Sequence, residues 1–326
     1  TLLSLTACGG ETETPPPPTD EKAETPAPQE PQTPPEPTPE ELAAQEIEDL
    51  LGSLTLEEKV GQLFFVRVPE TEALTDVSTY HLGGYILFSR DMKDAAGTWL
   101  TAEQLSANIS GWQDAAAADT GIPMLIGVDE EGGTVVRVSA NPNLRASKFT
   151  SPQRVWAAGG TEAVLLDTQE KDQLLASLGF NVNLAPVADV STDGSDFIHD
   201  RAFGQDAAAT ADYVAQVTAQ MSADNMGSVL KHFPGYGNNV DTHTGIALDE
   251  RPLETFETSD FLPFQAGIEA GGGKTAVLVS HNIMKAADDT LPASLSPAVH
   301  QILREELGFD GVAMTDDLAM DAVAAY

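Results

Sequence analysis

The sequence has little cysteine and few basic residues. Cys8 is the single cysteine among 326 residues, so the chain can form no internal disulfide and no cluster of cysteine thiolates around a metal. Sixteen Lys and Arg residues stand against 51 Asp and Glu residues, which gives a formal net charge of -35. Such a charge repels the phosphates of nucleic acids and the headgroups of anionic lipids, so we expect neither as a binding partner.

Long hydrophobic runs are missing as well. No stretch of the sequence approaches the roughly 20 consecutive apolar residues that a transmembrane helix needs. Hydrophobic residues nevertheless make up 41% of the chain, enough for one large globular domain or two modest ones. The composition therefore predicts a globular protein without a spanning segment.

The first eight residues resemble the end of an export signal. Within them, Leu5-Thr6-Ala7-Cys8 resembles a bacterial lipobox, in which the cysteine after the cleavage site carries lipid. An ordinary signal-peptide end with an incidental cysteine is the alternative; we favour the lipobox because the single cysteine stands at the expected place. We therefore expect a lipid on Cys8 and an exported protein. That lipid would be its only attachment to the bacterial cell membrane, with the protein facing outside the cytoplasm.

Residues 9–40 are expected to be a disordered linker. Eleven of the 21 prolines lie between Pro15 and Pro39, interleaved with Thr, Glu and Gln. Proline fixes φ and removes a hydrogen-bond donor, and the segment has few apolar residues to bury. Thirty residues of polyproline II conformation would span roughly 90 Å. The linker would act as a spacer whether it is extended or merely disordered.

From residue 41 onward the sequence alternates short apolar stretches with helical segments. Residues 42–51 predict an amphipathic helix, and Thr55 with Glu58 predicts a capping box at the start of a second helix. Seven stretches predict strands, at residues 63–68, 84–88, 124–128, 182–185, 228–231, 276–280 and 311–315. Four longer segments predict helices between them, at residues 101–118, 162–178, 207–224 and 297–307.

This alternation is typical of a parallel sheet covered by helices. We expect residues 41–326 to form an α/β domain of the TIM (β/α)8-barrel type, truncated before its eighth strand, because seven strands are visible where the barrel has eight. An open doubly wound sheet is the alternative. In a barrel, catalytic groups lie at the carboxyl ends of the strands and in the loops that follow.

The third and fourth strands are followed by candidate sugar-binding residues. Asp129 ends the third strand, and Arg137 lies close behind it. A carboxylate there can accept hydrogen bonds from two sugar hydroxyls, although capping a turn is the alternative role. Beyond the fourth strand, Arg201 offers a rigid fork of donors for a substrate oxygen, with a surface ion pair as the alternative. Asp189 is expected to be structural.

The fifth strand ends in Lys231 and His232, neither of which is a usual core residue. In the loop beyond, Asp241 and His243 are two residues apart, so the carboxylate can hold the imidazole Nδ1–H and leave Nε2 free for general acid catalysis. A loop histidine bonded to a neighbour is the alternative. We also considered a metal site of His232, Asp241 and His243, but no helical histidine spacing supports it, and we expect no metal.

The seventh strand is followed by two adjacent carboxylates. One can point into the barrel mouth, and the other can cap a helix expected to contain Leu318, Met320 and Val323. We assign the mouth to Asp316 and the cap to Asp317, although spacing alone does not separate them. His281, after the sixth strand, is expected to support the site from behind.

Lys231-His232-Phe233-Pro234-Gly235 followed by Asp241-Thr242-His243 resembles the signature of the bacterial β-N-acetylglucosaminidases of glycoside hydrolase family 3, the NagZ-like enzymes. Further stretches match in the same order, namely residues 54–63, 129–133, 201–204 and 315–317. The resemblance runs from about residue 50 to the end of the chain, and it implies retaining hydrolysis of terminal β-linked N-acetylhexosamine residues from peptidoglycan- or chitin-type glycans.

The resemblance also implies the role of each residue. Asp316 would be the nucleophile that forms a covalent glycosyl-enzyme, and His243, oriented by Asp241, would be the acid/base. The residues expected to bind the sugar are Asp129, Arg137, Arg201, Lys231 and His232. The implied chemistry needs no cofactor, the expected partner is the amino-sugar glycan substrate, and we expect a monomer.

The sequence departs from the family pattern at three positions. Tyr236 replaces a histidine of the loop, while Thr134 and Val136 stand where the family often has Arg and Gln. Three other functions are considered: a carbohydrate-binding lipoprotein without turnover, a family 3 β-glucosidase, and a phosphorylase. Binding alone requires no aligned nucleophile and acid, and the Asp241–His243 loop makes the glutamate acid/base of family 3 β-glucosidases unnecessary. A phosphorylase stays an alternative, because a histidine acid/base tolerates an anionic phosphate nucleophile better than a glutamate would.

Overall fold

The computed structural model describes residues 37–241 and 245–326. The chain divides into two compact units, residues 1–50 and 51–326. Helix α1 (Pro39–Ser53) contains most of the described residues of the first unit and continues three residues past its boundary, and it has no buried residue. The predicted lipidation site Cys8, residues 9–36 of the predicted linker and the predicted acid/base His243 lie outside the described residues.

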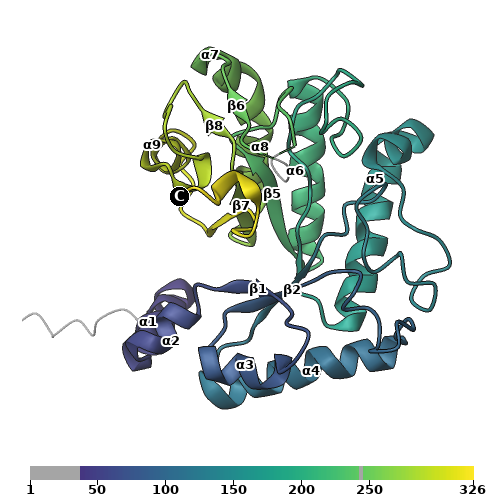
Figure 1. Cartoon of the computed structure of the whole chain (residues 1–326), viewed down its shortest axis with the longest axis vertical. Helices are drawn as coiled ribbons and strands as arrows, with labels where there is room; N and C mark the ends of the chain where they lie inside the picture. The colour runs from purple at the N-terminus through teal and green to yellow at the C-terminus, as the bar shows by residue number, and fades with distance from the viewer. Residues whose placement is uncertain (1–36, 242–244) are drawn as a thin grey trace, which may run out of the picture. The chain divides into compact units, whose positions relative to one another are not determined.

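The second unit is built on a parallel sheet of seven strands in chain order (Figure 1). Each strand pairs in parallel with the next. The strands are β1 (Phe65–Arg67), β2 (Gly84–Leu87), β3 (Leu125–Val128), β4 (Val182–Asn183), β5 (Gly227–Phe233), β7 (Thr275–Val279) and β9 (Ala313–Thr315). Every predicted strand overlaps one of these, so the sequence-based prediction of seven parallel strands is confirmed.

The sheet is curled, but it is not closed within the part of the chain that the structure describes. β1 and β9 are its two edges. An ion pair nevertheless joins Arg67, the last residue of β1, to Asp317, two residues beyond β9. The two edges therefore approach each other at their carboxyl ends. The observed architecture is an α/β half-barrel, for which the expected eight-stranded TIM barrel is only a coarse description.

Helices cover the outer face of the sheet, and neighbouring helices along the chain pack against one another. The α-helices of this unit are α2 (Leu56–Gly61), α3 (Ala73–Tyr80), α4 (Ala102–Asp119), α5 (Pro152–Leu178), α6 (Ala207–Ala223), α7 (Leu253–Thr255), α8 (Phe261–Ala270) and α9 (Pro297–Gln301). Short π-helical segments continue α7 at Phe256–Asp260 and α9 at Ile302–Glu306, and 3-10 turns form at Ala293–Leu295 and Asp321–Val323. A separate parallel pair joins β6 (Leu248–Asp249) to β8 (Ile283–Met284).

Local sequence signals account for several helix ends. The predicted capping box at Thr55 is present, because its side chain accepts from Glu58 N–H while Glu58 accepts from Thr55 N–H at 2.7 Å. Helix α5 begins ten residues before the predicted start at residue 162, and it bends at Gly159 and Gly160. Gly160 has φ +62° and ψ −152°, a conformation essentially restricted to glycine.

The prediction of a helix through Leu318, Met320 and Val323 is wrong. The structure places only a short 3-10 turn there, at Asp321–Val323. Leu318 is 60% exposed, so the apolar spacing does not mark a buried helix face.

Successive side chains on a strand point to opposite faces of the sheet and so belong to two different apolar clusters. On β2, Tyr85 and Leu87 join the large core between sheet and helices, while Ile86 packs in the smaller cluster inside the curl. On β5, Leu230 faces the large core and Val229 faces inward. Since side chains two apart share a face, this register directs Lys231 to the inside of the curl.

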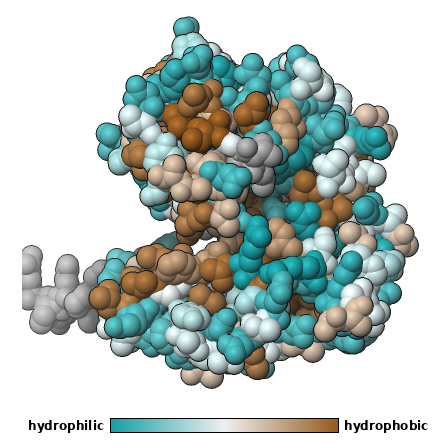
Figure 2. Space-filling model, viewed as in Figure 1, coloured by the Kyte–Doolittle hydropathy of each residue, from teal (hydrophilic) through white to brown (hydrophobic). Residues whose placement is uncertain are grey.

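Hydrophilic residues cover much of the face seen in Figure 2, and hydrophobic residues form smaller patches among them. Large hydrophobic side chains stay exposed next to both edge strands: Leu63 is 83% exposed, Phe64 49% and Val312 59%. Among the described residues, no helix is both long enough and apolar enough to span a membrane.

Candidate active site

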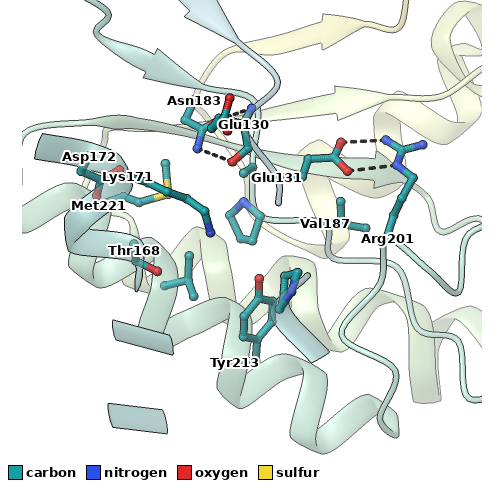
Figure 3. Close-up of a pocket in the computed structure, with 14 residues that line it drawn as sticks. Glu130, Glu131, Thr168, Lys171, Asp172, Asn183, Val187, Arg201, Tyr213 and Met221 are labelled. Atoms are coloured by element: carbon teal, nitrogen blue, oxygen red, sulfur yellow. Dashed lines mark hydrogen bonds and ion pairs between the residues drawn. The ribbon is translucent and has the colours of Figure 1, made fainter. Parts of the chain in front are cut away.

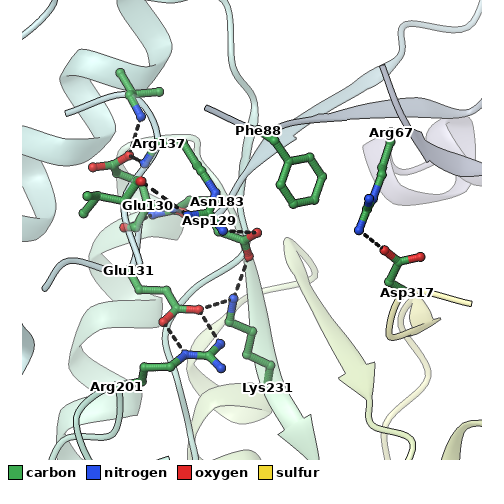
Figure 4. A network of polar contacts seen from close by, with 12 residues as sticks. Arg67, Phe88, Asp129, Glu130, Glu131, Arg137, Asn183, Arg201, Lys231 and Asp317 are labelled. Atoms are coloured by element: carbon green, nitrogen blue, oxygen red, sulfur yellow. Dashed lines mark hydrogen bonds and ion pairs between the residues drawn. The ribbon is translucent and has the colours of Figure 1, made fainter. Parts of the chain in front are cut away.

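Side chains from the carboxyl ends of several strands converge on one carboxylate (Figure 4). Glu131, in the loop after β3, receives two hydrogen bonds from Arg201, from Nε at 3.0 Å and from Nη2 at 2.8 Å. Lys231 Nζ lies 2.6 Å from the same carboxylate and 2.8 Å from Asp129 Oδ1. The structure thus brings the predicted binding residues Asp129, Arg201 and Lys231 together, through a glutamate that the sequence analysis did not single out.

The charges in this network balance although they are buried. Burial alone would raise the pKa of the Glu131 carboxyl, but Arg201 and Lys231 outweigh it and hold that pKa well below its usual range. Burial would likewise lower the pKa of Lys231, yet Asp129 and Glu131 raise it. Glu131 and Lys231 therefore stay ionised, and the network can present Asp129 and the cation edges to a polar ligand.

His232 is held from both sides. Its Nδ1 lies 2.7 Å from Asp189 Oδ2, and its Nε2 lies 3.1 Å from Arg201 Nη2. Because a guanidinium can only donate, Nε2 accepts from Arg201 and Nδ1 donates to Asp189. The other oxygen of Asp189 accepts from Tyr236 N–H at 2.7 Å. Asp189 therefore has the structural role expected for it, and His232 belongs to the same network as Glu131.

Glu130 shapes the loop from which Asp129 and Glu131 project. Its carboxylate accepts from the backbone N–H of Arg137 at 2.8 Å and of Val138 at 2.7 Å, and from the Ser139 hydroxyl. The side-chain amide of Asn183 bonds both the N–H and the C=O of Glu130, at 3.0 and 3.2 Å. The buried Glu130 is thus a backbone anchor, whereas its neighbour Glu131 faces the cations.

Arg137 lies at the rim of this network. Its Nη2 is 3.9 Å from Asp129 Oδ2, and its guanidinium lies 5.6 Å from the centre of the Phe88 ring. Arg67 approaches the same ring at 4.8 Å. Phe88 therefore stands between two cations (Figure 4), a position that no sequence motif indicated.

The two carboxylates after β9 have different surroundings. Asp317 pairs with Arg67 and accepts from Ala319 N–H at 2.9 Å, so it caps a turn and not the expected helix. Asp316 accepts from Asp317 N–H at 2.8 Å and is half-buried. His281, fully buried, approaches the Asp317 carbonyl with Nε2 at 3.0 Å, in keeping with its expected supporting position. The ion pair with Arg67 therefore distinguishes the surroundings of Asp317 from those of Asp316.

The loop that contains Asp241 is fixed at its far end by Arg251. The guanidinium contacts the buried carboxylates of Asp249 at 2.7 Å and Asp260 at 3.0 Å, and it donates to the Gly235 carbonyl at 3.3 Å. Burial raises the pKa of Asp260 to about 6, although Arg251 opposes the shift. The predicted orienting residue Asp241 lies among the described residues between these anchors, while its predicted partner His243 does not.

A small cavity lies behind the ion network, between the sheet and helices α5 and α6 (Figure 3). Glu131 and Arg201 form part of its lining, and α5 contributes Lys171 and Asp172. Asp172 is only 2% exposed, and burial, followed by the nearby charge of Asp224, raises its pKa to about 7. Within residues 37–241 and 245–326, no group of His, Cys, Asp and Glu is arranged to hold a metal ion.

Residues 55–326 match the family described as the glycosyl hydrolase family 3 N-terminal domain. The chain belongs to this family. It is 35% identical over 250 residues to a β-hexosaminidase of Stenotrophomonas maltophilia, a match that covers 74% of this chain and 69% of that protein.

Two solved structures show the same fold. A family 3 β-N-acetylglucosaminidase from Paenibacillus matches with a TM-score of 0.75 at 28% identity, over 84% of this chain and 51% of that one. A β-N-acetylhexosaminidase from Beutenbergia cavernae matches with a TM-score of 0.71 at 28% identity, over 84% and 82%. The chain therefore spans about half the length of the Paenibacillus enzyme.

Proposed function

We propose that this chain is a retaining β-N-acetylhexosaminidase, which removes a terminal non-reducing β-linked N-acetylglucosamine from peptidoglycan- or chitin-type glycans. The observation that carries the proposal is the convergence of Arg201, Lys231 and Asp129 around Glu131, at the strand edge that also carries Asp316. Membership of family 3 and the similarity to a β-hexosaminidase support it.

The network is suited to a neutral, hydroxyl-rich ring. Asp129 supplies acceptor oxygens for hydroxyls, and the hydrogen bond from Lys231 holds its carboxylate in place. Arg137 at the rim adds donors for an amide or hydroxyl oxygen, and His232 is held in one tautomer between Asp189 and Arg201. Groups fixed in advance orient the sugar without the cost of ordering them on binding.

In the proposed reaction, Asp316 attacks the anomeric carbon while His243, oriented by Asp241, gives a proton to the departing oxygen. The bond to the leaving group breaks as the glycosyl–Asp316 bond forms. His243 then takes a proton from water, the water oxygen attacks the anomeric carbon, and Asp316 leaves as a carboxylate. Two displacements give net retention of configuration. The His–Asp pair takes the place of the second carboxyl that retaining glycosidases ordinarily use.

Hydrolysis of a chromogenic N-acetyl-β-glucosaminide tests the proposal. The native protein should release the chromophore, and Asp316→Asn should abolish release, with the adjacent Asp317→Asn as its matched control. His243→Ala should lose roughly 10²–10⁴-fold in rate, the usual contribution of a general acid/base. A native protein that binds N-acetylglucosamine without turnover would contradict the proposal and support the binding lipoprotein. Formation of a sugar phosphate only when inorganic phosphate is added would support the phosphorylase.

The place of action is a separate proposal. We propose that a lipid on Cys8 holds the protein on the outer side of the cell membrane, with residues 9–40 as the spacer. The lipobox-like tetrad ending at the single cysteine supports this. Fractionation of cells should place the native protein in the membrane fraction, and Cys8→Ser should release it. Recovery of the native protein in the cytosol would contradict the proposal.

A further inference from the structure

A second hollow lies away from the ion network, between the first halves of α5 and α6. Its volume is about 190 Å³. The α5 wall carries Trp156 and Thr161, and the α6 wall carries Asp212 and Gln216. We call this hollow the α5–α6 groove. None of these four residues takes part in the proposed chemistry.

Stacked aromatic rings form the apolar part of the groove. Phe203 stacks on Tyr213 with ring centres 4.3 Å apart and planes 3° apart. Trp156 meets the edge of Phe203 at 5.7 Å and 78°. Phe203 and Tyr213 are buried, whereas Trp156 is 41% exposed. A partly exposed indole on a rigid aromatic base presents a flat apolar surface whose position costs little entropy to fix.

The bend in α5 positions this indole. Gly159 and Gly160 interrupt the helix between Trp156 and Thr161, which places these two groove residues on differently directed segments. A positive φ with extended ψ at Gly160 is a conformation that other residues avoid. The bend therefore depends on the glycine pair.

Polar groups on the opposite wall complement the aromatic surface. Asp212 is exposed and supplies acceptors, while the half-buried amide of Gln216 supplies both donors and acceptors. An aromatic plane faced by a carboxylate and an amide matches a pyranose ring, which has apolar C–H faces and hydroxyls around its edge. The net charge of -35 disfavours anionic ligands. A neutral sugar matches the aromatic and polar walls of the groove and also carries no negative charge.

The groove has one lining residue in common with the cavity behind the ion network. Phe203 lies two residues beyond Arg201, whose guanidinium holds Glu131. Tyr213 lines both the groove and the cavity behind Glu131 and Arg201.

We propose that the α5–α6 groove is a secondary binding site for an N-acetylglucosamine unit of a neutral polymeric glycan, separate from the catalytic centre. The proposed function supplies the class of ligand, but the groove itself needs no turnover. The site would raise the affinity for polymers by adding a second attachment point, because linked sites bind more tightly than either one alone. It would leave small glycosides unaffected.

Binding to insoluble chitin and to a soluble chito-oligosaccharide tests the proposal. Both are measured with the full chain carrying Asp316→Asn, so that the ligand is not consumed. Adding Trp156→Ala should weaken binding at least about tenfold, the scale for an interface aromatic. Gln216→Ala should also weaken it. Tyr80→Ala, which removes an aromatic that is 60% exposed on α3, is the matched control and should bind as before.

In the otherwise native chain, Trp156→Ala should hydrolyse a chromogenic monosaccharide glycoside at the native rate but lose activity on the polymer. Oligosaccharide should quench or shift tryptophan fluorescence in the parent and not in Trp156→Ala, where Trp99 and Trp112 remain. Unchanged polymer binding in Trp156→Ala would overturn the proposal. Loss of chitin binding in Trp156→Ala, when the native chain shows no glycosidase activity, would uphold the groove and reject the proposed function.

Discussion

Arg201 binds Glu131 through two parallel hydrogen bonds, Nε to Oε2 at 3.0 Å and Nη2 to Oε1 at 2.8 Å. This fork fixes both side chains in one plane. Lys231 then reaches the same carboxylate at 2.6 Å. The geometry of the candidate sugar site therefore depends on a residue that need not touch the sugar.

Replacing this carboxylate should damage both stability and binding. Glu131→Gln leaves Arg201 and Lys231 buried beside a neutral amide, and breaking a buried pair costs roughly 3–5 kcal/mol. Chemical denaturation should show this loss, and KM should rise more than kcat falls. Glu170→Gln, at an exposed pair with Arg145, is the control and should leave both measurements unchanged.

The effect of Glu131→Gln should depend on pH. Because the folded state lowers the pKa of Glu131, its stabilisation is present above the unfolded value of about 4.3 and is lost as the pH falls below it. The difference in unfolding free energy between native and variant should therefore be large at pH 7 and shrink towards pH 2. A difference that grows with acid would contradict the assignment.

The contribution of Asp172 to stability should change with pH in the opposite direction to that of Glu131. Below about pH 3.9 its carboxyl is protonated in both folded and unfolded chains; from there up to about pH 7 only the folded chain keeps the proton, so rising pH removes stability. Asp172→Asn should therefore be more stable than the native chain at pH 8, and the gap should narrow towards pH 4. Thermal melts at both pH values measure this, with the exposed Asp114→Asn on α4 as the control. If the variant and the native chain differed in melting temperature by the same amount at both pH values, the raised pKa of Asp172 would be contradicted.

Arg251 should stabilise the far end of the loop that carries the proposed dyad. Arg251→Met leaves Asp249 and Asp260 buried without their cation, at a cost of roughly 3–5 kcal/mol. We expect a lower melting temperature and a lower kcat at temperatures where the variant stays folded. Lys285→Met, which removes an exposed pair with Glu250, should change neither. Native kcat in folded Arg251→Met would show that the anchor does not serve catalysis.

The sequence predicted the sheet well because buried parallel strands are apolar on both faces and are separated by clear turns. All seven predicted strands are present. Side chains two residues apart on a strand share a face, which explains why Lys231 points to the inside of the curl, as Val229 does. The predicted helix at residues 162–178 misses the first ten residues of α5. Glycine is a poor helix former, yet the chain only bends at Gly159 and Gly160 and remains helical on both sides.

The sequence alone could not distinguish the roles of adjacent carboxylates. Glu130 and Glu131 have the same chemistry, yet one binds backbone amides and the other binds cations from β5 and the loop after β4. Only the course of the loop separates them. Similarly, the ion pair that distinguishes Asp317 from Asp316 joins positions 250 residues apart in the chain. A local pattern carries no information about such a partner.

Covalent trapping with a mechanism-based fluoroglycoside of N-acetylglucosamine type, followed by peptide mapping of the labelled residue, identifies the nucleophile directly. We expect one glycosyl group per chain, attached to Asp316, and no label in Asp316→Asn. Label on Asp317, or turnover that persists in Asp316→Asn without any trapped intermediate, would contradict this expectation.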